Sequence, residues 1–451
     1  MKNRLVRLYH PWEKFFRKTV YSAFEAFLHA QMTNGIILML FTLTALIWVN
    51  SPWSASYEHL LHTHIAFSVG SFSLDHSVHF WVNDGLMTLF FFHVGLEIKR
   101  EILVGELSDF KVAVLPILAA IGGMVVPALI FFAITKGTLG ASGWGIPMAT
   151  DIAFAVSVVI LLGKRISPAL VTFLVALAIV DDLGAVSVIA IFYTAKIQIL
   201  SLIIALALWC VLIVINRFGI RSALPYTIIG VFVWFFTLES GVHATIAGVL
   251  VAMTIPSLPK YDPRFFAKPM KELINGFEED PIKDNFTLDD KQKRIVRGMK
   301  SQLCGVEAPL NRYEDGLHVP IGILIIPIFA LINAGLPIDF SSLDALLLEK
   351  VSLGVIFGLV LGKMFGIFGA SYIAIKLGLA KLPEDTSMNQ LFGVSFLGGI
   401  GFTMSIFVAD LAYSDNPELL IQSKTAVLVA SLIAGFTGYI WLRFIASSKS
   451  A

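Results

Sequence analysis

Two adjacent carboxylates, Asp181 and Asp182, lie near the centre of the apolar run 171–189. A run of about 20 apolar residues is long enough to cross a membrane as a helix, and each charge at mid-bilayer costs roughly 2.5–3.5 kcal/mol even on the lenient insertion scale. One interpretation is structural, with the acids tied to basic partners on other helices. The other is a cation or proton site, because intramembrane acids usually face a wet cavity or a partner. We favour the cation or proton site.

Two further apolar segments carry residues that interrupt a helix. Residues 145–151, GIPMATD, place Pro147, Thr150 and Asp151 in one of them, and residues 398–403, GGIGFT, concentrate three glycines in the other. Proline removes a backbone donor, and each glycine costs a helix roughly 1 kcal/mol. Irregular backbone at membrane depth is tolerated only where it lines a cavity or contacts protein. Both segments therefore indicate broken helices at a transport site.

A lysine, Lys363, also lies within an apolar run, among glycines spaced by four residues at 358, 362 and 366. Such glycines share one helix face and allow another backbone to approach closely. A lysine inside this packing needs a carboxylate partner, and we expect Asp181 or Asp182. A phosphate-binding Walker A loop is excluded, because the glycine spacing is one residue short and Met364 follows the lysine.

The elements that carry these groups are predicted to be membrane-spanning helices. The chain is 57% hydrophobic and only 14% charged, against about 25% charged in soluble domains, so we predict an all-α polytopic membrane protein. About 12 spans are expected, near residues 34–50, 84–105, 111–135, 144–163, 168–194, 197–215, 222–238, 241–256, 318–335, 351–377, 389–410 and 421–443. The net charge of +1 offers no basic footprint for nucleic acid.

The distribution of Lys and Arg predicts the orientation of these spans. With a cytoplasmic amino terminus, 28 of the 33 Lys and Arg fall in inner segments, as the positive-inside rule requires. Both termini are therefore expected in the cytoplasm. The interrupted segments are the central members of spans 3–5 and 10–12, and these triplets lie seven spans apart, so the sequence predicts an inverted repeat.

Segments outside the spans divide the chain further. Residues 1–33 are expected to form an amphipathic interfacial arm, residues 34–443 the transmembrane domain, and residues 444–451 a cytoplasmic tail. An outer β-hairpin is predicted near 64–74, where apolar residues alternate around Gly70-Ser71; because an isolated hairpin is marginally stable, a second protomer is one candidate partner. The charged segment 257–317 is interpreted as a partly ordered inner loop.

Mixed-charge clusters occur at the inner end of span two and in the loop before span nine. The first contains Glu97, Arg100 and Glu101, and the second contains Glu314 and His318. Solvated helix ends are the simpler interpretation, but carboxylates beside His and Arg could also titrate near neutral pH. His243, at the start of span eight, is either an interfacial histidine or part of the function.

These motifs resemble those of the NhaA-type bacterial sodium/proton antiporters. The matching stretches extend over spans two to eleven and read VNDGLMTLFFFHVGLEIKRE, PMATDIAFAV, ALAIVDDLGA, SGVHATIAGV, PIFALINAG, GKMFGI and GIGFTMSIF. The resemblance implies an electrogenic, pH-regulated exchanger in the bacterial inner membrane that exports Na⁺ or Li⁺ for protons by alternating access and needs no cofactor. It is therefore expected to be a transporter and not an enzyme, in contact with membrane lipid and dimeric through the hairpin.

The resemblance also implies roles for individual residues. Asp181 and Asp182 would bind Na⁺ and protons, and Thr150 would line the site. Asp151 and Lys363 would balance the dipoles of the half-helices where broken spans four and eleven cross at mid-membrane. The pH-sensing region would comprise Glu97, Arg100, Glu101, Glu314 and His318, with Asp84 and His243 as further matched polar positions.

Two departures from the family pattern concern the pH response. The inner loop before span nine is longer than expected, and Asp315 stands where a second histidine would be expected beside Glu314. Two other functions were weighed. A proton-coupled carrier of organic solutes would need aromatic and directional polar groups around the Asp pair. An intramembrane aspartyl protease would need its two acids on separate helices. The sequence leaves the preference among Na⁺, Li⁺ and K⁺ open.

Overall fold

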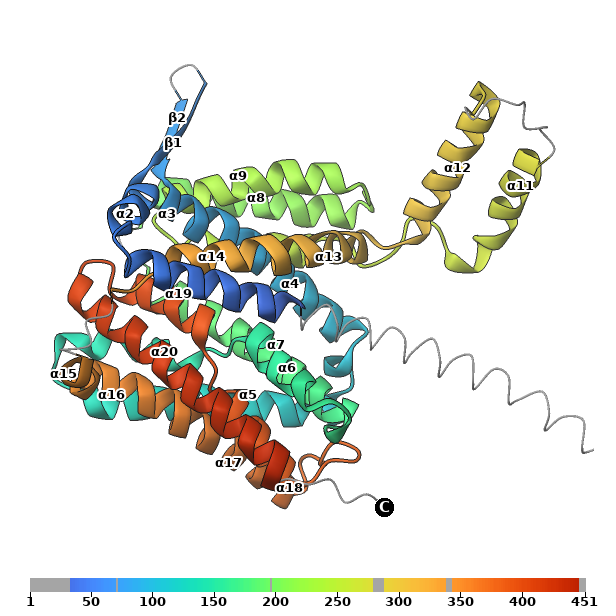
Figure 1. Cartoon of the computed structure of the whole chain (residues 1–451). Helices are drawn as coiled ribbons and strands as arrows, with labels where there is room; N and C mark the ends of the chain where they lie inside the picture. Colours follow the sequence, from blue (N-terminus) through green and yellow to red (C-terminus); the bar gives the residue numbers. More distant parts are fainter. Residues whose placement is uncertain (1–32, 70–71, 195–196, 279–287, 338–342, 446–451) are drawn as a thin grey trace, which may run out of the picture. The chain divides into compact units, whose positions relative to one another are not determined.

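The computed structural model describes residues 33–69, 72–194, 197–278, 288–337 and 343–445. These residues are mainly helical (Figure 1). They divide into two units. Unit 1 comprises residues up to 86, 106–193 and 322 onward, and unit 2 comprises 87–105 and 194–321. The predicted arm at 1–33 lies outside the described residues except for Thr33, and most of the tail at 444–451 does so as well.

Unit 1 begins with a helix, a hairpin and a short irregular helix. The successive elements are the helix Thr33–Val49, α2 (Ser54–His62), β1 (His64–Val69), β2 (Phe72–Ser77), α3 (Val78–Phe80) and the π-helical η1 (Trp81–Leu86). The two strands pair antiparallel, with His64 opposite Ser77 and Phe67 opposite Leu74. This confirms the predicted β-hairpin and extends its second strand to residue 77.

The remainder of unit 1 forms a helical body. Its elements are η2 (Glu106–Ser108), α5 (Phe110–Thr135), η3 (Leu139–Met148), α6 (Ile152–Leu162), η4 (Gly163–Arg165), α7 (Pro168–Phe192), α14 (Ile326–Asn333), α15 (Leu343–Leu348), α16 (Lys350–Phe357), η7 (Gly358–Gly362), α17 (Lys363–Lys376), α18 (Met388–Leu397), α19 (Phe402–Ala412), α20 (Pro417–Ile440) and η8 (Trp441–Ile445). A buried apolar cluster joins α5, α6, α7, α17, α18 and α20.

Local sequence sets the starts of the helices that carry the candidate site. The Ser167 hydroxyl accepts a hydrogen bond from the Leu170 amide, and Pro168 follows at the first position of α7; both are favoured helix-start features. Ser387 and Gln390 form a reciprocal capping box at the start of α18. The helices therefore begin at fixed residues, which sets the register of the polar groups along them.

The glycines near Lys363 pack against α5 as the sequence predicts. A Cβ on Gly362 would lie 2.7 Å from Pro127 Cα, and one on Gly366 would lie 2.2 Å from the Gly122 carbonyl oxygen. Residues 358–362 form the π-helical turn η7, a feature that often marks functional sites and that the sequence reading did not anticipate. The absent side chains bring α17 close enough to α5 to bury Lys363.

This packing makes Gly366→Ala a destabilising substitution. The new methyl group would meet a backbone oxygen that cannot rotate away, so the two helices would have to separate, at a cost of about 1–3 kcal/mol. The melting temperature of the purified protein should fall. Gly369 is a matched control on the same helix, because a Cβ there meets nothing within 4 Å. An unchanged melting temperature in Gly366→Ala would contradict the close approach.

Unit 2 contains two helical groups. Its elements are α4 (Met87–Leu103), α8 (Ile199–Arg217), α9 (Ala223–Glu239), α10 (Thr245–Thr254), η5 (Pro263–Phe265), α11 (Ala267–Glu278), α12 (Asp290–Val306), α13 (Pro309–Pro320) and the first residue of η6 (Ile321–Ile325), whose other residues belong to unit 1. A buried apolar cluster is shared by α4, α8, α9, α10 and α13. Within the segment 257–317, α11 and α12 pack against each other, so the described part of this segment is substantially helical.

The predicted spans coincide with helices, but their number stays a prediction. Among the described residues, six helices are long and apolar enough to cross a membrane, and three bent helix pairs each qualify as one broken span. Two of these pairs, η3 with α6 (43°) and α18 with α19 (45°), are the interrupted segments identified in the sequence. The predicted position of Glu314 and His318 was wrong. They lie within the helix α13 and not in a loop before span nine.

Candidate ion-binding site

The two broken helices contact each other at their breaks, within unit 1. The Asp151 amide donates to the Ile400 carbonyl at 2.6 Å, and the Ser405 hydroxyl donates to the Ile146 carbonyl at 2.7 Å. Gly401 is required here, because a Cβ would lie 2.8 Å from the Ala149 carbonyl oxygen. Groups at each break thus form hydrogen bonds with backbone groups at the other break, which explains how an irregular backbone is tolerated in an apolar interior.

Asp151 lies at the amino ends of both second half-helices. Its Oδ1 accepts from the Phe154 amide at 3.1 Å, at the start of α6, and its Oδ2 accepts from the Thr403 amide at 3.0 Å and hydroxyl at 2.6 Å, at the start of α19. Only 2% of Asp151 is exposed. A carboxylate at two helix amino ends is placed where helix dipoles favour negative charge, in the position expected for dipole compensation.

Asp181, Lys363 and Thr150 form a fully buried polar group beside this contact. The Lys363 amine forms an ion pair with Asp181 Oδ2 and also donates to the Thr150 hydroxyl at 3.0 Å. The Thr150 oxygen lies 2.6 Å from Asp181 Oδ2 and 2.8 Å from the Gly398 carbonyl oxygen. All three side chains have no exposed surface. The predicted carboxylate partner of Lys363 is therefore Asp181.

The two adjacent acids occupy one buried stretch of α7. Asp182 is 1% exposed and Asp181 is fully buried. Asp181 Oδ1 has no hydrogen-bond partner among the residues that the structure describes. A small hard cation is held by oxygen ligands, and the oxygens available here come from two carboxylates, the Thr150 hydroxyl and the Gly398 carbonyl. Carboxylate oxygens also bind protons, so these groups have the chemistry for competition between a cation and protons.

The predicted pH-sensing residues come together within unit 2. Arg100 of α4 pairs with Glu101 and with Glu314 of α13, each at 2.9 Å. Glu97 lies 3.5 Å from His93, whose ring centroid is 6.0 Å from that of His318. Every predicted member of the cluster is among these residues. His93 was not identified from the sequence as a member.

Two other matched polar positions lie elsewhere. Asp84 is half-buried in η1, next to Asn83, whose side-chain amide exchanges hydrogen bonds with that of Asn333 in α14. His243 lies in the turn between α9 and α10 of unit 2, where Gly241 has a φ of +80°.

Sequence reasoning missed two features of unit 1. Thr403 supplies two of the hydrogen bonds to Asp151, and its signal was present, since it is the hydroxyl residue directly after the GGIGF break. Asp410 of α19 and Lys424 of α20 form a second buried ion pair at 2.7 Å, with side chains 8% and 9% exposed. Neither residue of this pair was singled out from the sequence.

Comparison with known proteins identifies the family. The family model described as Na⁺/H⁺ antiporter 1 matches residues 25–442. The chain belongs to the NhaA family of Na⁺/H⁺ antiporters. It is 57% identical over 445 residues to the Na⁺/H⁺ antiporter NhaA of Sulfurimonas denitrificans, covering 99% of this chain and all of the relative. It is 48% identical to NhaA 1 of Saccharophagus degradans, covering 97% and 95%, and 45% identical to NhaA of Dichelobacter nodosus, covering 98% and 95%.

Membership of the NhaA family confirms the resemblance drawn from the motifs. Proteins named Na⁺/H⁺ antiporters are secondary transporters and not enzymes, and the family is one of polytopic membrane proteins. Together with the apolar helices, it makes this chain a multi-pass bacterial membrane protein. The buried group at Asp181 can therefore be considered in the setting of sodium/proton exchange.

Proposed function

We propose that this chain exports Na⁺ or Li⁺ in exchange for protons by alternating access, with Asp181 and Asp182 as the shared cation and proton site. The observation that supports this most is the buried ion pair of Asp181 with Lys363 at the contact between two broken helices. Buried charges on irregular backbone are costly to maintain, and transport sites are a setting in which such groups occur.

Competition follows from the chemistry of the site. The carboxylate oxygens that would bind sodium are the same oxygens that would bind protons, so the two cations exclude each other. To bind sodium, Asp181 must share or release Lys363, which occupies Oδ2. Two changes would favour sodium binding. Asp182 would lose a proton, and Lys363 would either lose a proton or move. Proton uptake would restore the ion pair and expel sodium.

The protonation of Lys363 decides the charge moved in each cycle. With Lys363 charged, Asp181 ionised and Asp182 protonated, the site is neutral. If both Lys363 and Asp182 release a proton for one sodium bound, the occupied site carries one net negative charge and exchange is electrogenic. If only Asp182 releases a proton, exchange is electroneutral. We propose the electrogenic cycle, in which the membrane potential helps to drive sodium out.

We propose that alternating access depends on the inverted repeat predicted from the sequence. The triplets α5, η3–α6 and α7 on one side, and α16–α17, α18–α19 and α20 on the other, would be related as an inverted repeat of spans 3–5 and 10–12. The matching bends of 43° and 45° in the central members support this relation. Movement at the two breaks would expose Asp181 and Asp182 to one side of the membrane at a time.

The test uses purified protein in liposomes with an acid interior. Addition of sodium or lithium outside should collapse the pH gradient, and Asp182→Asn should abolish the response. Potassium serves as the comparison cation. A gradient that no cation collapses from neutral to alkaline pH would contradict the proposal and would favour the solute-carrier alternative.

We propose that the cluster around Arg100 adjusts exchange to pH. Glu314 pairs with Arg100 across α4 and α13, so its protonation would weaken the link between these helices. Glu97, Glu101, His93 and His318 lie around the pair within unit 2.

Glu314→Gln is therefore expected to behave like the protonated state at every pH. Exchange at alkaline pH should fall towards its acid level, and the pH profile should become less steep. The measurement is the initial rate of sodium-driven proton flux in liposomes across a pH series. Asp290→Asn is the control, since Asp290 is an acid of the same unit whose side chain is 88% exposed and paired with Lys293 at 3.4 Å. An unchanged profile in Glu314→Gln would remove the cluster from the proposal.

Location and assembly complete the proposal. We place the chain in the inner membrane with both termini cytoplasmic, on the distribution of Lys and Arg. The hairpin of β1 and β2 would join two protomers, because each strand pairs only with the other within the described residues, which leaves two open strand edges. No cofactor is proposed, as Na⁺, Li⁺ and H⁺ are the cargo.

A further inference from the structure

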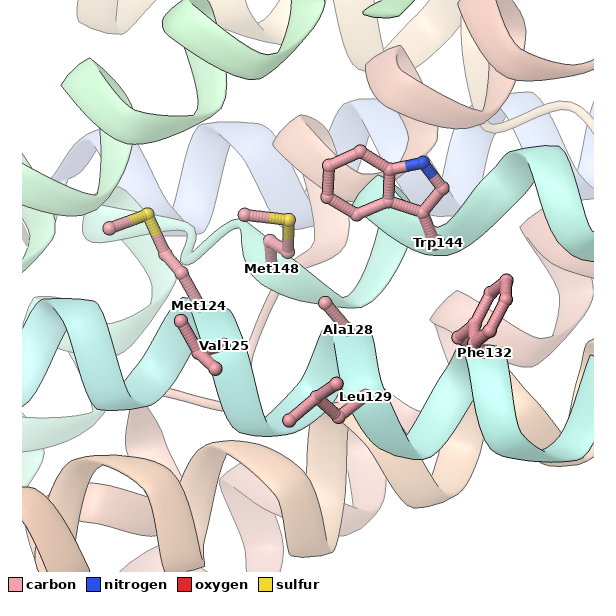
Figure 2. Close-up of a pocket in the computed structure, with 7 residues that line it drawn as sticks. All are labelled: Met124, Val125, Ala128, Leu129, Phe132, Trp144 and Met148. Atoms are coloured by element: carbon pink, nitrogen blue, oxygen red, sulfur yellow. The ribbon is translucent and has the colours of Figure 1, made fainter.

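An apolar cavity opens beside the first half of a broken helix. It has a volume of about 380 Å³, within the range of small-molecule sites. Figure 2 shows Trp144 and Met148 of η3 opposite the α5 side chains that complete it. The lining residues of α5 are Met124, Val125, Ala128, Leu129 and Phe132. The only polar lining atom among these side chains is the indole nitrogen of Trp144.

The cavity lies directly behind the ion-binding group of unit 1. Met148 precedes Thr150 by two residues in the chain. Met124 packs against α7 at Gly184, where a Cβ would lie 2.1 Å from the Met124 sulfur, two residues after Asp182. On the opposite side of α5, a Cβ on Gly123 would lie 3.7 Å from Lys363 Cδ. Whatever fills the cavity therefore contacts α5 and η3, and α5 packs against the helices α7 and α17 that carry the Asp pair and Lys363.

The mouth of the cavity belongs to the apolar outer surface of α5. Val125, Ala128, Leu129 and Phe132 follow the i, i+3, i+4, i+7 spacing of one helix face. Leu129 is 62% exposed, and Val125 and Phe132 are about half exposed. α5 is long and apolar enough to cross a membrane, so this face meets hydrocarbon. The apolar lining offers no partner for a charged or strongly polar ligand.

We propose that the cavity binds one acyl chain of a membrane phospholipid, which supports η3 and α5 behind the site. The chain enters from the hydrocarbon that covers the α5 face and packs between Trp144 and Ala128. The bound chain makes dispersion contacts with η3 that are absent when the cavity is empty, and these contacts stabilise η3 in the position seen in the structure. The head group remains at the membrane surface, so the acyl chain and not the head group determines which lipids bind.

Trp144 provides a direct reporter of the chain. Phospholipids brominated along their acyl chains quench tryptophan fluorescence on contact, and subtraction of a Trp144→Phe variant isolates Trp144 among the eight tryptophans. In vesicles of brominated phosphatidylcholine, the Trp144 signal should be quenched. Ala128→Phe places a ring in the cavity and should cause loss of most of that quenching, because the chain is displaced.

A matched variant separates the cavity from the surrounding lipid. Ile121→Phe adds a ring on the same helix at a position 46% exposed and outside the lining, and it should leave the quenching of Trp144 unchanged. Equal quenching in Ala128→Phe and the parent would overturn the proposal. Absence of quenching in the parent would also overturn it and would indicate that protein, such as a second copy, covers this face.

Thermal stability gives a second readout that does not depend on fluorescence. In detergent, addition of phospholipid should raise the melting temperature of the parent and of Ile121→Phe, and this increase should be smaller in Ala128→Phe. If Ala128→Phe does not fold, Ala128→Leu fills less of the cavity and carries the same expectations. An equal increase in all variants would contradict the supporting role. Neither readout involves sodium, so their failure is distinguishable from failure of the proposed exchange.

Discussion

Lys363→Met is expected to lower the melting temperature of the purified protein sharply. The substitution removes the cation that pairs with Asp181 in a group with no exposed surface. Breaking a buried pair from one side leaves an uncompensated charge and typically costs about 3–5 kcal/mol. The comparison variant is Lys376→Met on the same helix, which replaces an exposed lysine and should change stability by no more than about 0.5 kcal/mol.

The double variant Asp181→Asn/Lys363→Met tests whether the pair is the cause. Removing both charges removes the uncompensated group, and replacing a buried pair by neutral groups is often close to neutral in stability. The melting temperature should therefore recover most of the loss seen in Lys363→Met. A single variant as stable as the parent, or a double variant less stable than both single variants, would show that the ion pair does not hold α7 and α17 as described.

Asp182→Asn is expected to abolish sodium-dependent proton flux with little effect on folding. Asn keeps the shape of the side chain but has neither the negative charge nor the titratable proton that exchange requires. Loss of a supporting group around a bound metal weakens affinity about 10–100-fold, so loss of a proposed ligand should weaken sodium binding by at least this factor. The measurement is the initial rate of proton flux in liposomes over a sodium series.

Asp410→Asn is the matched control for this experiment. Asp410 is another buried carboxylate of unit 1, but its partner is Lys424 of α20 and not Lys363. Its substitution should lower stability without changing the apparent KM for sodium in the protein that remains folded. Equal loss of flux in both variants would mean that general loosening of unit 1, and not loss of a ligand, explains the effect of Asp182→Asn.

The sequence predicted the parts of the site whose residues are energetically unfavourable in their local surroundings. Charges in an apolar run and glycines in a helix are each unfavourable unless the fold compensates for them, so Asp181, Lys363 and the two breaks were identifiable without coordinates. The partner of Lys363 was limited to Asp181 or Asp182, and the register of α7 against α17 selects Asp181.

The residues that were missed depend on tertiary packing. Thr403 is an ordinary helix residue until the breaks meet and bring Asp151 to its amide. His93 lies in an apolar stretch, and its place beside His318 depends on how α13 packs on α4. Asp410 and Lys424 are near the ends of different helices, and only the packing of α19 on α20 pairs them. Neither spacing nor composition contains that information.

The most direct test of shared binding measures sodium affinity against pH. Titration calorimetry of the purified protein gives the dissociation constant for sodium, and buffers of different ionisation enthalpy report protons released on binding. If sodium and protons compete at Asp181 and Asp182, affinity should strengthen about tenfold per pH unit for each proton released, and Asp182→Asn should lose both binding and proton release. A dissociation constant that is the same from neutral to alkaline pH, with no proton released, would contradict the account.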